Sequence, residues 1–458
     1  MSIASNKTTD KTVPSITKQL ALLAIPTFGQ LIAEPAFILV DTAIIGHVSD
    51  SALAGLSLGS TIVLTAVGLC IFLAYSTTSQ VARLFGAGQK REGLQVGVDS
   101  MWLSLVIGVV LAAVLFVFAD PLCFLLGGRG ADLTQAVMYT QAVVIGVPGM
   151  LLVYASNGIY RGLQKINITL VAAVSGAVLN TVLDIIFVIV LGWGIAGSGF
   201  ATLIAQWFMG LFLAIPAIRW ALKDGVTLRP HFAGIAAAGH DGFPLFVRTL
   251  ALRIAIVATV VVAASMGTQV LAGYQIVNAV WNFAVNILDS VAIAGQALVG
   301  AKLGAQAFGE ARKLTQVTAR SGMVMGISVG ILFVGLGFFA GQLFSPSEEI
   351  QYVVTAGMLV SGITMPLQGW MWALDGILIG AGDFRYLALT LLFVAGLYIV
   401  ILAIIEFCVV PFLSNSFIGA LVLWGAFDVV LMGGRAIANG LRIRKDVWMI
   451  NAATAALD

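Results

Sequence analysis

Twelve runs of about 20 mostly apolar residues dominate what this chain can fold into, because a helix of that length crosses a bilayer core of about 30 Å. Inside a bilayer, only helices and closed barrels satisfy every backbone hydrogen-bonding group. Of the 458 residues, 60% are hydrophobic and 10% are charged. The sequence therefore predicts an all-α integral membrane protein with 12 transmembrane helices. The runs lie near residues 18–43, 51–76, 95–119, 133–158, 167–191, 197–220, 244–265, 270–298, 317–343, 350–376, 385–410 and 417–440.

The basic residues predict the orientation of the spans, because Lys and Arg favour the cytoplasmic ends of transmembrane helices. With 12 spans and a cytoplasmic N-terminus, 20 of the 23 lysines and arginines fall in cytoplasmic segments. Arg129 falls outside, while Arg248 and Arg253 lie near the cytoplasmic start of the seventh span, where long side chains can reach water. We expect both termini in the cytoplasm and no cleavable signal before the first span.

The two halves of the chain resemble each other at a constant offset of 218 residues, as in Pro26 with Pro244 and Pro148 with Pro366. Six spans per repeat is an even number, so the two six-helix lobes should have the same orientation and be related by a pseudo-twofold axis along the membrane normal. Such an arrangement suits a cavity between the lobes. The predicted divisions are a cytoplasmic tail (1–17), an N-lobe (18–220), a cytoplasmic linker (221–243), a C-lobe (244–440) and a second cytoplasmic tail (441–458).

Ionisable groups inside a bilayer are costly and are therefore candidates for function. Asp41 and Asp184 both fall in the outer part of outward-running spans, so their depths agree. Asn180 precedes Asp184 by one helical turn and shares its face, and Thr202 begins the next span at the same depth. Such a group can hold a proton or bind a small hard cation such as Na⁺ through oxygen ligands. In the alternative interpretation, Asp41 caps a helix end and Asp184 only packs against a neighbouring helix.

The second repeat does not reproduce this cluster. The offset places Thr259 opposite Asp41, and it places Tyr398 and Leu402 opposite Asn180 and Asp184. Any ion coupling should therefore belong to the first lobe.

Other polar residues in the spans carry weaker hypotheses. Pro26 lies about halfway between the cytoplasmic start of the first span and Asp41, where the missing amide and the ring can kink the helix, so we expect a conformational hinge there. Asn157 and its repeat partner Asp375 are predicted to line a central substrate cavity, although both could cap helices. For four further acids the sequence indicates neither a structural nor a functional role: Glu34, Asp289, Glu406 and Asp428.

Several classes of function are not supported. A net charge of +2, with basic residues scattered between apolar runs, gives no nucleic-acid surface. The three cysteines have no CxxC spacing, and HExxH, GxxxxGK[ST] and GxSxG are absent. We predict no catalytic residue, no cofactor and no nucleotide hydrolysis by this chain. Transport would then be driven by an ion gradient or by the ATPase of another chain, and the ion gradient is favoured.

Three segments resemble the multidrug and toxic compound extrusion (MATE) family, in particular its DinF-like prokaryotic branch: IPTFGQLIAEPAFILVDTAIIGHVSDSALAGLSL, QVARLFGAGQ and NGIYRGLQ. The resemblance implies an antiporter in the cytoplasmic membrane of a prokaryote that exports organic, often cationic or amphipathic, compounds against H⁺ or Na⁺. It also implies that Asp41, Asn180 and Asp184 are the coupling residues, that Thr202 completes their site and that the first span bends at Pro26. The quoted segments do not include the second-lobe acid of another MATE branch, so Asp289 is not given that role.

These implications predict alternating access in which ion binding in the N-lobe bends the first span. The partners are then small organic substrates and the lipid bilayer, and the monomer is expected to suffice. A lipid-linked glycan flippase is an alternative, but it needs a more cationic cavity than Arg248 and Arg253 supply. A scaffold without a transport cycle is a third interpretation, against which the paired outer acids argue.

Overall fold

The computed structural model describes residues 15–413 and 415–454, so most of the predicted N-terminal tail and the end of the C-terminal tail lie outside it. Every described element is helical. The helices of the first half are α1 (Ile16–Gly46), α2 (Asp50–Leu69), α3 (Phe72–Gly86), α4 (Lys90–Val117), α5 (Ala119–Leu125), α6 (Gly130–Val144), α7 (Val147–Gly162), α8 (Ile166–Asp184), the π-helical turn η1 (Ile185–Val190) and α9 (Gly194–Lys223).

The second half repeats this order with longer, less interrupted helices. It contains α10 (Phe232–Ser265), α11 (Thr268–Gly304), α12 (Phe308–Phe344), α13 (Glu348–Gly380), α14 (Phe384–Ile404), the π-helical turn η2 (Ile405–Val409), the 3₁₀ turn η3 (Val410–Phe412), α15 (Ser416–Ala426), the π-helical turn η4 (Phe427–Met432), α16 (Gly433–Ile443) and α17 (Val447–Thr454). Within the described ranges, 11 helices are long and apolar enough to cross a membrane, or 12 if the pair α6 and α7, bent by 48°, is one span. The predicted all-α membrane fold is confirmed.

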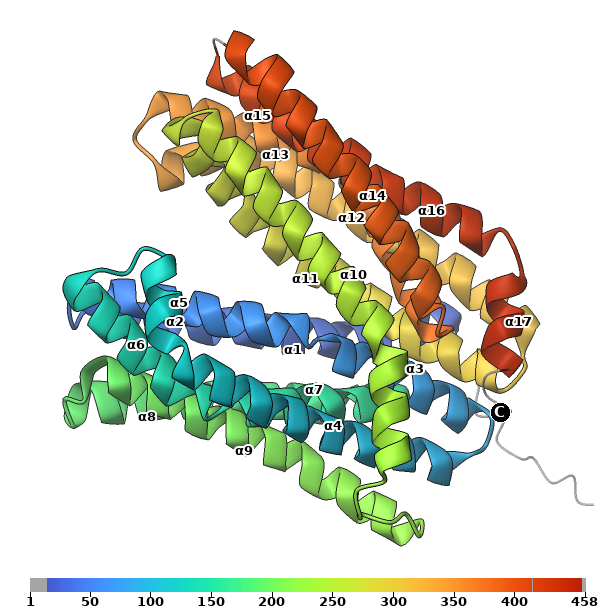
Figure 1. Cartoon of the computed structure of the whole chain (residues 1–458). Coiled ribbons are helices and arrows are strands. Elements are labelled where there is room, and N and C mark those ends of the chain that lie inside the picture. Colours follow the sequence, from blue (N-terminus) through green and yellow to red (C-terminus); the bar gives the residue numbers. More distant parts are fainter. Residues whose placement is uncertain (1–14, 414, 455–458) are drawn as a thin grey trace, which may run out of the picture.

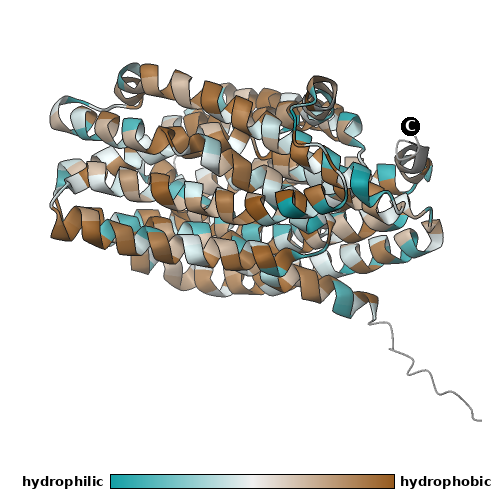
Figure 2. Cartoon of the chain, turned by 90° about the horizontal axis from the view of Figure 1, so that it is seen from below, coloured by the Kyte–Doolittle hydropathy of each residue, from teal (hydrophilic) through white to brown (hydrophobic). Residues whose placement is uncertain are grey.

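Two lobes diverge from a common end, as Figure 1 shows. Helices α1–α9 form one lobe and α10–α16 the other, and the lobes are farthest apart where α5 and α15 lie. They converge near α3 and α17, which is the end that carries the described C-terminus. We call these the open end and the closed end. Hydrophobic residues cover the length of the outer helices in Figure 2, and hydrophilic ones gather toward the helix ends, as expected for a surface in contact with lipid.

The offset of 218 residues also relates the backbones of the two lobes. The helices α11, α12 and α13 begin at residues 268, 308 and 348, which are the equivalents of residues 50, 90 and 130 that begin α2, α4 and α6. A left-handed residue follows α3 at Gly88 and α11 at Gln306 (φ 79° and 56°), and another pair occurs at Gln164 and Gly382 (φ 58° and 78°). Each pair ends equivalent helices, so the repeat includes the helix caps.

The closed end is held by close backbone contact between α3 and α11. A Cβ atom on Gly86 would lie 1.9 Å from the Ala301 carbonyl oxygen, and one on Gly304 would lie 1.9 Å from that of Arg83. These two contacts are equivalent under the offset, so the pseudo-twofold axis passes between them. Hydrogen bonds reinforce the closure, since Arg83 Nη1 donates to the Ala381 carbonyl at 2.6 Å.

The non-helical connection between the halves lies within the predicted linker 221–243. Helix α9 continues to Lys223 and α10 begins at Phe232, leaving a turn of residues 224–231. The first turns of α10 pack on the N-lobe, where a Cβ on Gly242 would lie 2.5 Å from Phe72. Hydropathy falls where a helix leaves the bilayer, and the helix itself can continue beyond that point.

Candidate functional site

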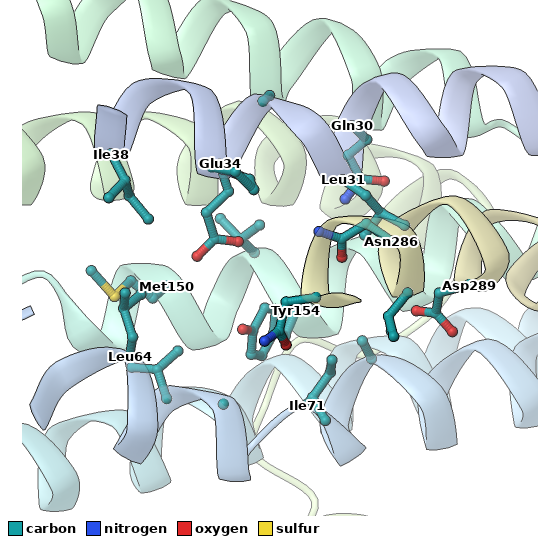
Figure 3. Close-up of a pocket in the computed structure, with 18 of the residues that line it drawn as sticks. Gln30, Leu31, Glu34, Ile38, Leu64, Ile71, Met150, Tyr154, Asn286 and Asp289 are labelled. Atoms are coloured by element: carbon teal, nitrogen blue, oxygen red, sulfur yellow. The ribbon is translucent and has the colours of Figure 1, made fainter. Parts of the chain in front are cut away.

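A cavity of about 980 Å³ opens between the two lobes. Its volume is within the range of small-molecule sites. Figure 3 shows Glu34 of α1, Tyr154 of α7 and Asp289 of α11 pointing into it. Its polar and aromatic lining residues include Gln30, Glu34, Asp41, Tyr75, Tyr139, Tyr154, Asn157, Arg161, Thr202, Gln206, Arg248, Arg253, Trp281, Asn286, Asp289, Trp372, Asp375 and Arg435.

Asp41, Asn180 and Asp184 meet between α1 and α8 in the N-lobe. The Asn180 amide nitrogen donates to Asp41 Oδ1 at 2.7 Å and to Asp184 Oδ2 at 3.0 Å. Both carboxylates are buried, with 3% of Asp41 and none of Asp184 exposed. Asp41 and Thr202 line the cavity, so they connect the buried cluster to it.

The cluster holds oxygens that lack partners within the described residues. Asn180 Oδ1, Asp184 Oδ1 and the hydroxyls of Ser198 and Thr202 are buried without a hydrogen-bond partner there. Buried polar atoms are rarely left unpaired in proteins, so these oxygens are available to bind a cation or water. Carboxylate, amide and hydroxyl oxygens together suit a small hard cation, and two neighbouring carboxylates also suit a proton. The donor set at Asp41, Asn180, Asp184 and Thr202 therefore fits either H⁺ or Na⁺.

The backbone is irregular next to this cluster. Asp184 is the last residue of α8, and the π-helical turn η1 begins directly after it. Such turns concentrate at functional sites. On the opposite side, α1 runs without a break from Ile16 to Gly46 with Pro26 and Pro35 inside it. Pro26 removes one backbone hydrogen bond, which leaves a weak point between the closed end and Asp41.

The equivalent position in the C-lobe keeps the contact but changes its chemistry. Thr259 Oγ1 and the Tyr398 hydroxyl, which correspond to Asp41 and Asn180, are hydrogen-bonded at 2.8 Å. A pair of hydroxyls carries no charge to neutralise. The first lobe alone therefore has an acid at this position.

Asp375 forms a buried ionic network at the closed end of the cavity. Arg248 and Arg435 both donate to its Oδ2, and Asn439 donates to Oδ1 at 2.6 Å. The network joins α10, α13 and α16, so Asp375 does not act as a helix cap. Its repeat partner Asn157 also lines the cavity and has a buried amide oxygen without a hydrogen-bond partner in the described structure.

The other embedded acids lie in different surroundings. Glu34 and Asp289 line the cavity, and Asp289 accepts a hydrogen bond from the Tyr75 hydroxyl at 3.0 Å. Asp428 is fully buried in the C-lobe, where it accepts hydrogen bonds from Ser361 at 2.9 Å and Gln368 at 3.0 Å. Glu406 is partly exposed and accepts one from Ser265 at 2.5 Å.

Two arginines of the cavity are not predicted from the sequence. Counting along the spans places Arg161 and Arg435 in cytoplasmic segments, but they are 5% and 4% exposed and line the cavity. The sequence spacing does indicate that Arg161 faces the cavity, because Arg161 follows the predicted cavity residue Asn157 by four residues on one helix face. Arg435 likewise follows Asp428 by two turns.

Comparisons with known proteins agree with this architecture. The crystal structure of the Vibrio cholerae MATE transporter VcmN in the bent form is 20% identical and covers 95% of this chain and 98% of its own, with a TM-score of 0.81. A MOP superfamily transporter from Pyrococcus furiosus is 21% identical, covers 97% of each chain and has a TM-score of 0.82. At these identities the likeness shows the fold.

Comparison with relatives in sequence identifies the family. Protein DETOXIFICATION 43 of Arabidopsis thaliana is 30% identical over 75% of this chain, and the alignment spans 64% of that relative's length. DNA damage-inducible protein F of Escherichia coli is 27% identical over 80% of each protein, and multidrug resistance protein MdtK of Yersinia enterocolitica is 24% identical over 93% and 95%. A family model described as MatE matches residues 26–186 and 244–405. The chain therefore belongs to the MatE family of multi-pass membrane transporters.

Proposed function

We propose that this protein is a secondary active exporter that moves small organic compounds out of the cell in exchange for H⁺ or Na⁺. The observation that carries the proposal is the N-lobe cluster, in which two buried carboxylates share one amide donor and face partnerless oxygens. Relatives named for multidrug resistance support the broad substrate class. The closed end is the cytoplasmic one, which makes this conformation outward-facing.

The cycle begins with substrate in the cavity and an empty coupling site. A proton or Na⁺ then enters from the open end and neutralises the charge shared by Asp41 and Asp184. Because two carboxylates this close repel each other and hold water, their neutralisation lets α1 bend at Pro26 and narrow the N-lobe side of the cavity. Substrate leaves, the lobes reverse their opening, and the ion is released to the cytoplasm. The ion must bind the two conformations with different affinity, since equal affinity shifts no equilibrium.

The test is efflux of ethidium from proteoliposomes under an inward-directed pH or Na⁺ gradient. We expect the gradient to accelerate efflux by the wild type and to have little effect on Asp41→Asn or Asp184→Asn. The fall should be roughly 5- to 150-fold, the range for a coupling free energy of about 1–3 kcal/mol. The gradient that drives efflux identifies the ion.

Asp120→Asn provides the matched control, because Asp120 is exposed on α5 at the open end and does not line the cavity. It should transport like the wild type. Unchanged ion coupling in Asp41→Asn would contradict the assignment of the coupling site.

A further inference from the structure

Positive charge is concentrated in the closed-end half of the cavity. Arg161, Arg248 and Arg435 line this part, together with the carboxylates of Asp289 and Asp375. Arg253 is equivalent to Pro35 under the 218-residue offset and therefore lies at the depth of Glu34. The other two acids of the lining, Glu34 and Asp41, lie farther along α1 toward the open end. In the closed-end half three guanidinium groups face two carboxylates, and in the open-end half two carboxylates face one guanidinium group. The cavity therefore has an acidic open-end half and a basic closed-end half.

The carboxylates of the basic half compensate its positive charge only in part. Arg248 and Arg435 share the single carboxylate of Asp375. Asp289 accepts its hydrogen bond from Tyr75 and not from an arginine. Arg161 forms no direct ion pair within the described residues, and the Asp289 carboxylate acts on its charge only from a longer distance.

Arg161 is the most informative of the three arginines in the closed-end half. It is 5% exposed, its Nη2 donates to the neutral Gln30 oxygen at 3.3 Å, and its Nε is buried without a hydrogen-bond partner in the part of the chain that the structure describes. A buried charge without a direct ion-pair partner is costly. Arginine also offers a planar fork of donors that matches carboxylate and phosphate oxygens. An unpaired, buried guanidinium facing a cavity is suited to an anionic ligand.

Apolar and aromatic surface completes the pocket beside these charges. Trp281 and Trp372 line the same cavity with ring centroids 6.1 Å apart, and the Arg435 guanidinium lies 4.7 Å from the Trp372 ring centroid. This wall fits the organic body of a ligand, while the arginines fit its charged group.

We propose that the closed-end half of the cavity binds an anionic group of the substrate, a carboxylate or a phosphate, with Arg161 as the main contact. The substrate class is therefore organic anions and zwitterions as well as amphipathic compounds. This inference rests on the proposed function, because it assigns the cavity to transported substrates.

The first test is binding to the purified protein, which needs no transport cycle. Carboxyfluorescein and ethidium are aromatic dyes of similar size and opposite charge, and fluorescence anisotropy measures the binding of each. We expect Arg161→Gln to weaken carboxyfluorescein binding roughly 10- to 100-fold, the loss typical of a hydrogen bond to a charged group. Arg161→Lys keeps the charge and should retain more of the affinity. Ethidium binding by Arg161→Gln should equal or exceed that of the wild type, which also shows that the variant is folded.

Arg219→Gln is the matched control, since Arg219 is exposed on α9 and lies outside the cavity. It should bind both dyes like the wild type. Failure of the wild type to bind carboxyfluorescein, or an equal loss of both dyes in Arg161→Gln, would overturn the proposal.

Two further measurements identify the source of the anion and distinguish the anion site from the proposed exporter function. Competition by dihexanoyl phosphatidylglycerol that exceeds competition by glycerol phosphate would place the anion on a lipid head group, and the reverse order would place it on a soluble compound.

Gradient-driven efflux is measured separately with both dyes. Arg161-dependent binding without gradient-driven efflux would sustain the anion site and contradict the exporter. Gradient-driven ethidium efflux without any carboxyfluorescein binding would sustain the exporter and overturn the anion site.

Discussion

The same residue type, aspartate, has three different environments in this protein. Asp41 shares an amide donor with another carboxylate in the N-lobe. Asp375 lies between two guanidinium groups at the closed end. Asp428 is buried among neutral donors from α13. The first arrangement can gain or lose a cation, the second is a fixed ionic contact, and the third holds the C-lobe helices together through hydrogen bonds.

Replacing Asp375 with Asn should strongly destabilise the fold. The change would leave Arg248 and Arg435 buried without a carboxylate, and breaking a buried pair costs about 3–5 kcal/mol. The measurement is the apparent melting temperature in detergent. Asp446→Asn is the comparison, because Asp446 pairs with Arg312 while both side chains are 58% exposed. Its loss should cost less than about 1 kcal/mol, and equal effects of the two changes would contradict the ionic network.

The N-lobe cluster can be proposed from the sequence because depth in the bilayer follows from counting along each span. Asp41 and Asp184 lie at similar distances from the starts of their outward-running spans, and Asn180 is one turn from Asp184. Side-chain partners that come from distant spans cannot be proposed this way. Asp428 has no visible partner in the sequence, because Ser361 and Gln368 reach it from a helix about 60 residues earlier.

Helix ends illustrate how a repeat tolerates different residues at one backbone position. After α3 the left-handed position is Gly88, and after α11 the equivalent position is Gln306. Both positions have the same hydrogen bond, in which the next amide donates to a carbonyl five residues earlier in the chain (Gln89 to Leu84 and Ala307 to Lys302). The cap is therefore set by the backbone, and a side chain there is strained.

Replacing Gln306 with Gly should stabilise the protein by about 0.5–1 kcal/mol. Relief of the left-handed strain, roughly 1–2 kcal/mol, exceeds the entropic cost of a more flexible unfolded chain, about 0.4–1 kcal/mol. The Gln306 side chain is exposed, so few contacts are lost. The reciprocal change, Gly88→Gln, should lower the melting temperature, since a Cβ there meets no atom within 4 Å and only the strain acts. Melting temperatures that move in the same direction for both variants would refute this explanation of the cap.

Element boundaries are less predictable than the elements themselves. The 12 apolar runs identify the spans, and the structure has a helix or a closely spaced helix pair at each of them. Hydropathy does not report where helices continue into water, so α11 extends to Gly304 although the apolar run near residues 270–298 ends earlier. The sequence misplaces Arg161 and Arg435 for the same reason. A basic residue near the end of an apolar run can face a loop or a cavity, and only packing decides which.

At the scale of the whole molecule, two lobes that meet at one end can expose the cavity between them alternately to the two sides of the membrane. The closure depends on backbone contact at Gly86 and Gly304, where no side chain fits. The cavity beside this closure has an acidic half and a basic half, and the coupling cluster adjoins the acidic half through Asp41 and Thr202. A cation that binds the cluster would change the charge of one lobe only, which gives the transition its asymmetry.

The distance between the lobes at the open end tests this directly. Spin labels at Leu125 of α5 and Leu343 of α12, which are 80% and 81% exposed, report it by double electron–electron resonance. The exposed Cys408 is replaced with serine, and the buried Cys70 and Cys123 are kept. Gly86→Ala supplies a reference in which the closed end is forced apart.

We expect a lower pH or added Na⁺ to move the wild-type distances toward the shorter values of the Gly86→Ala reference, because the ion favours the conformation that closes the open end. In Asp41→Asn, the distances should no longer respond to the ion. Wild-type distances that ignore both ions, or an ion response that persists in Asp41→Asn, would contradict ion-driven alternating access through the N-lobe cluster.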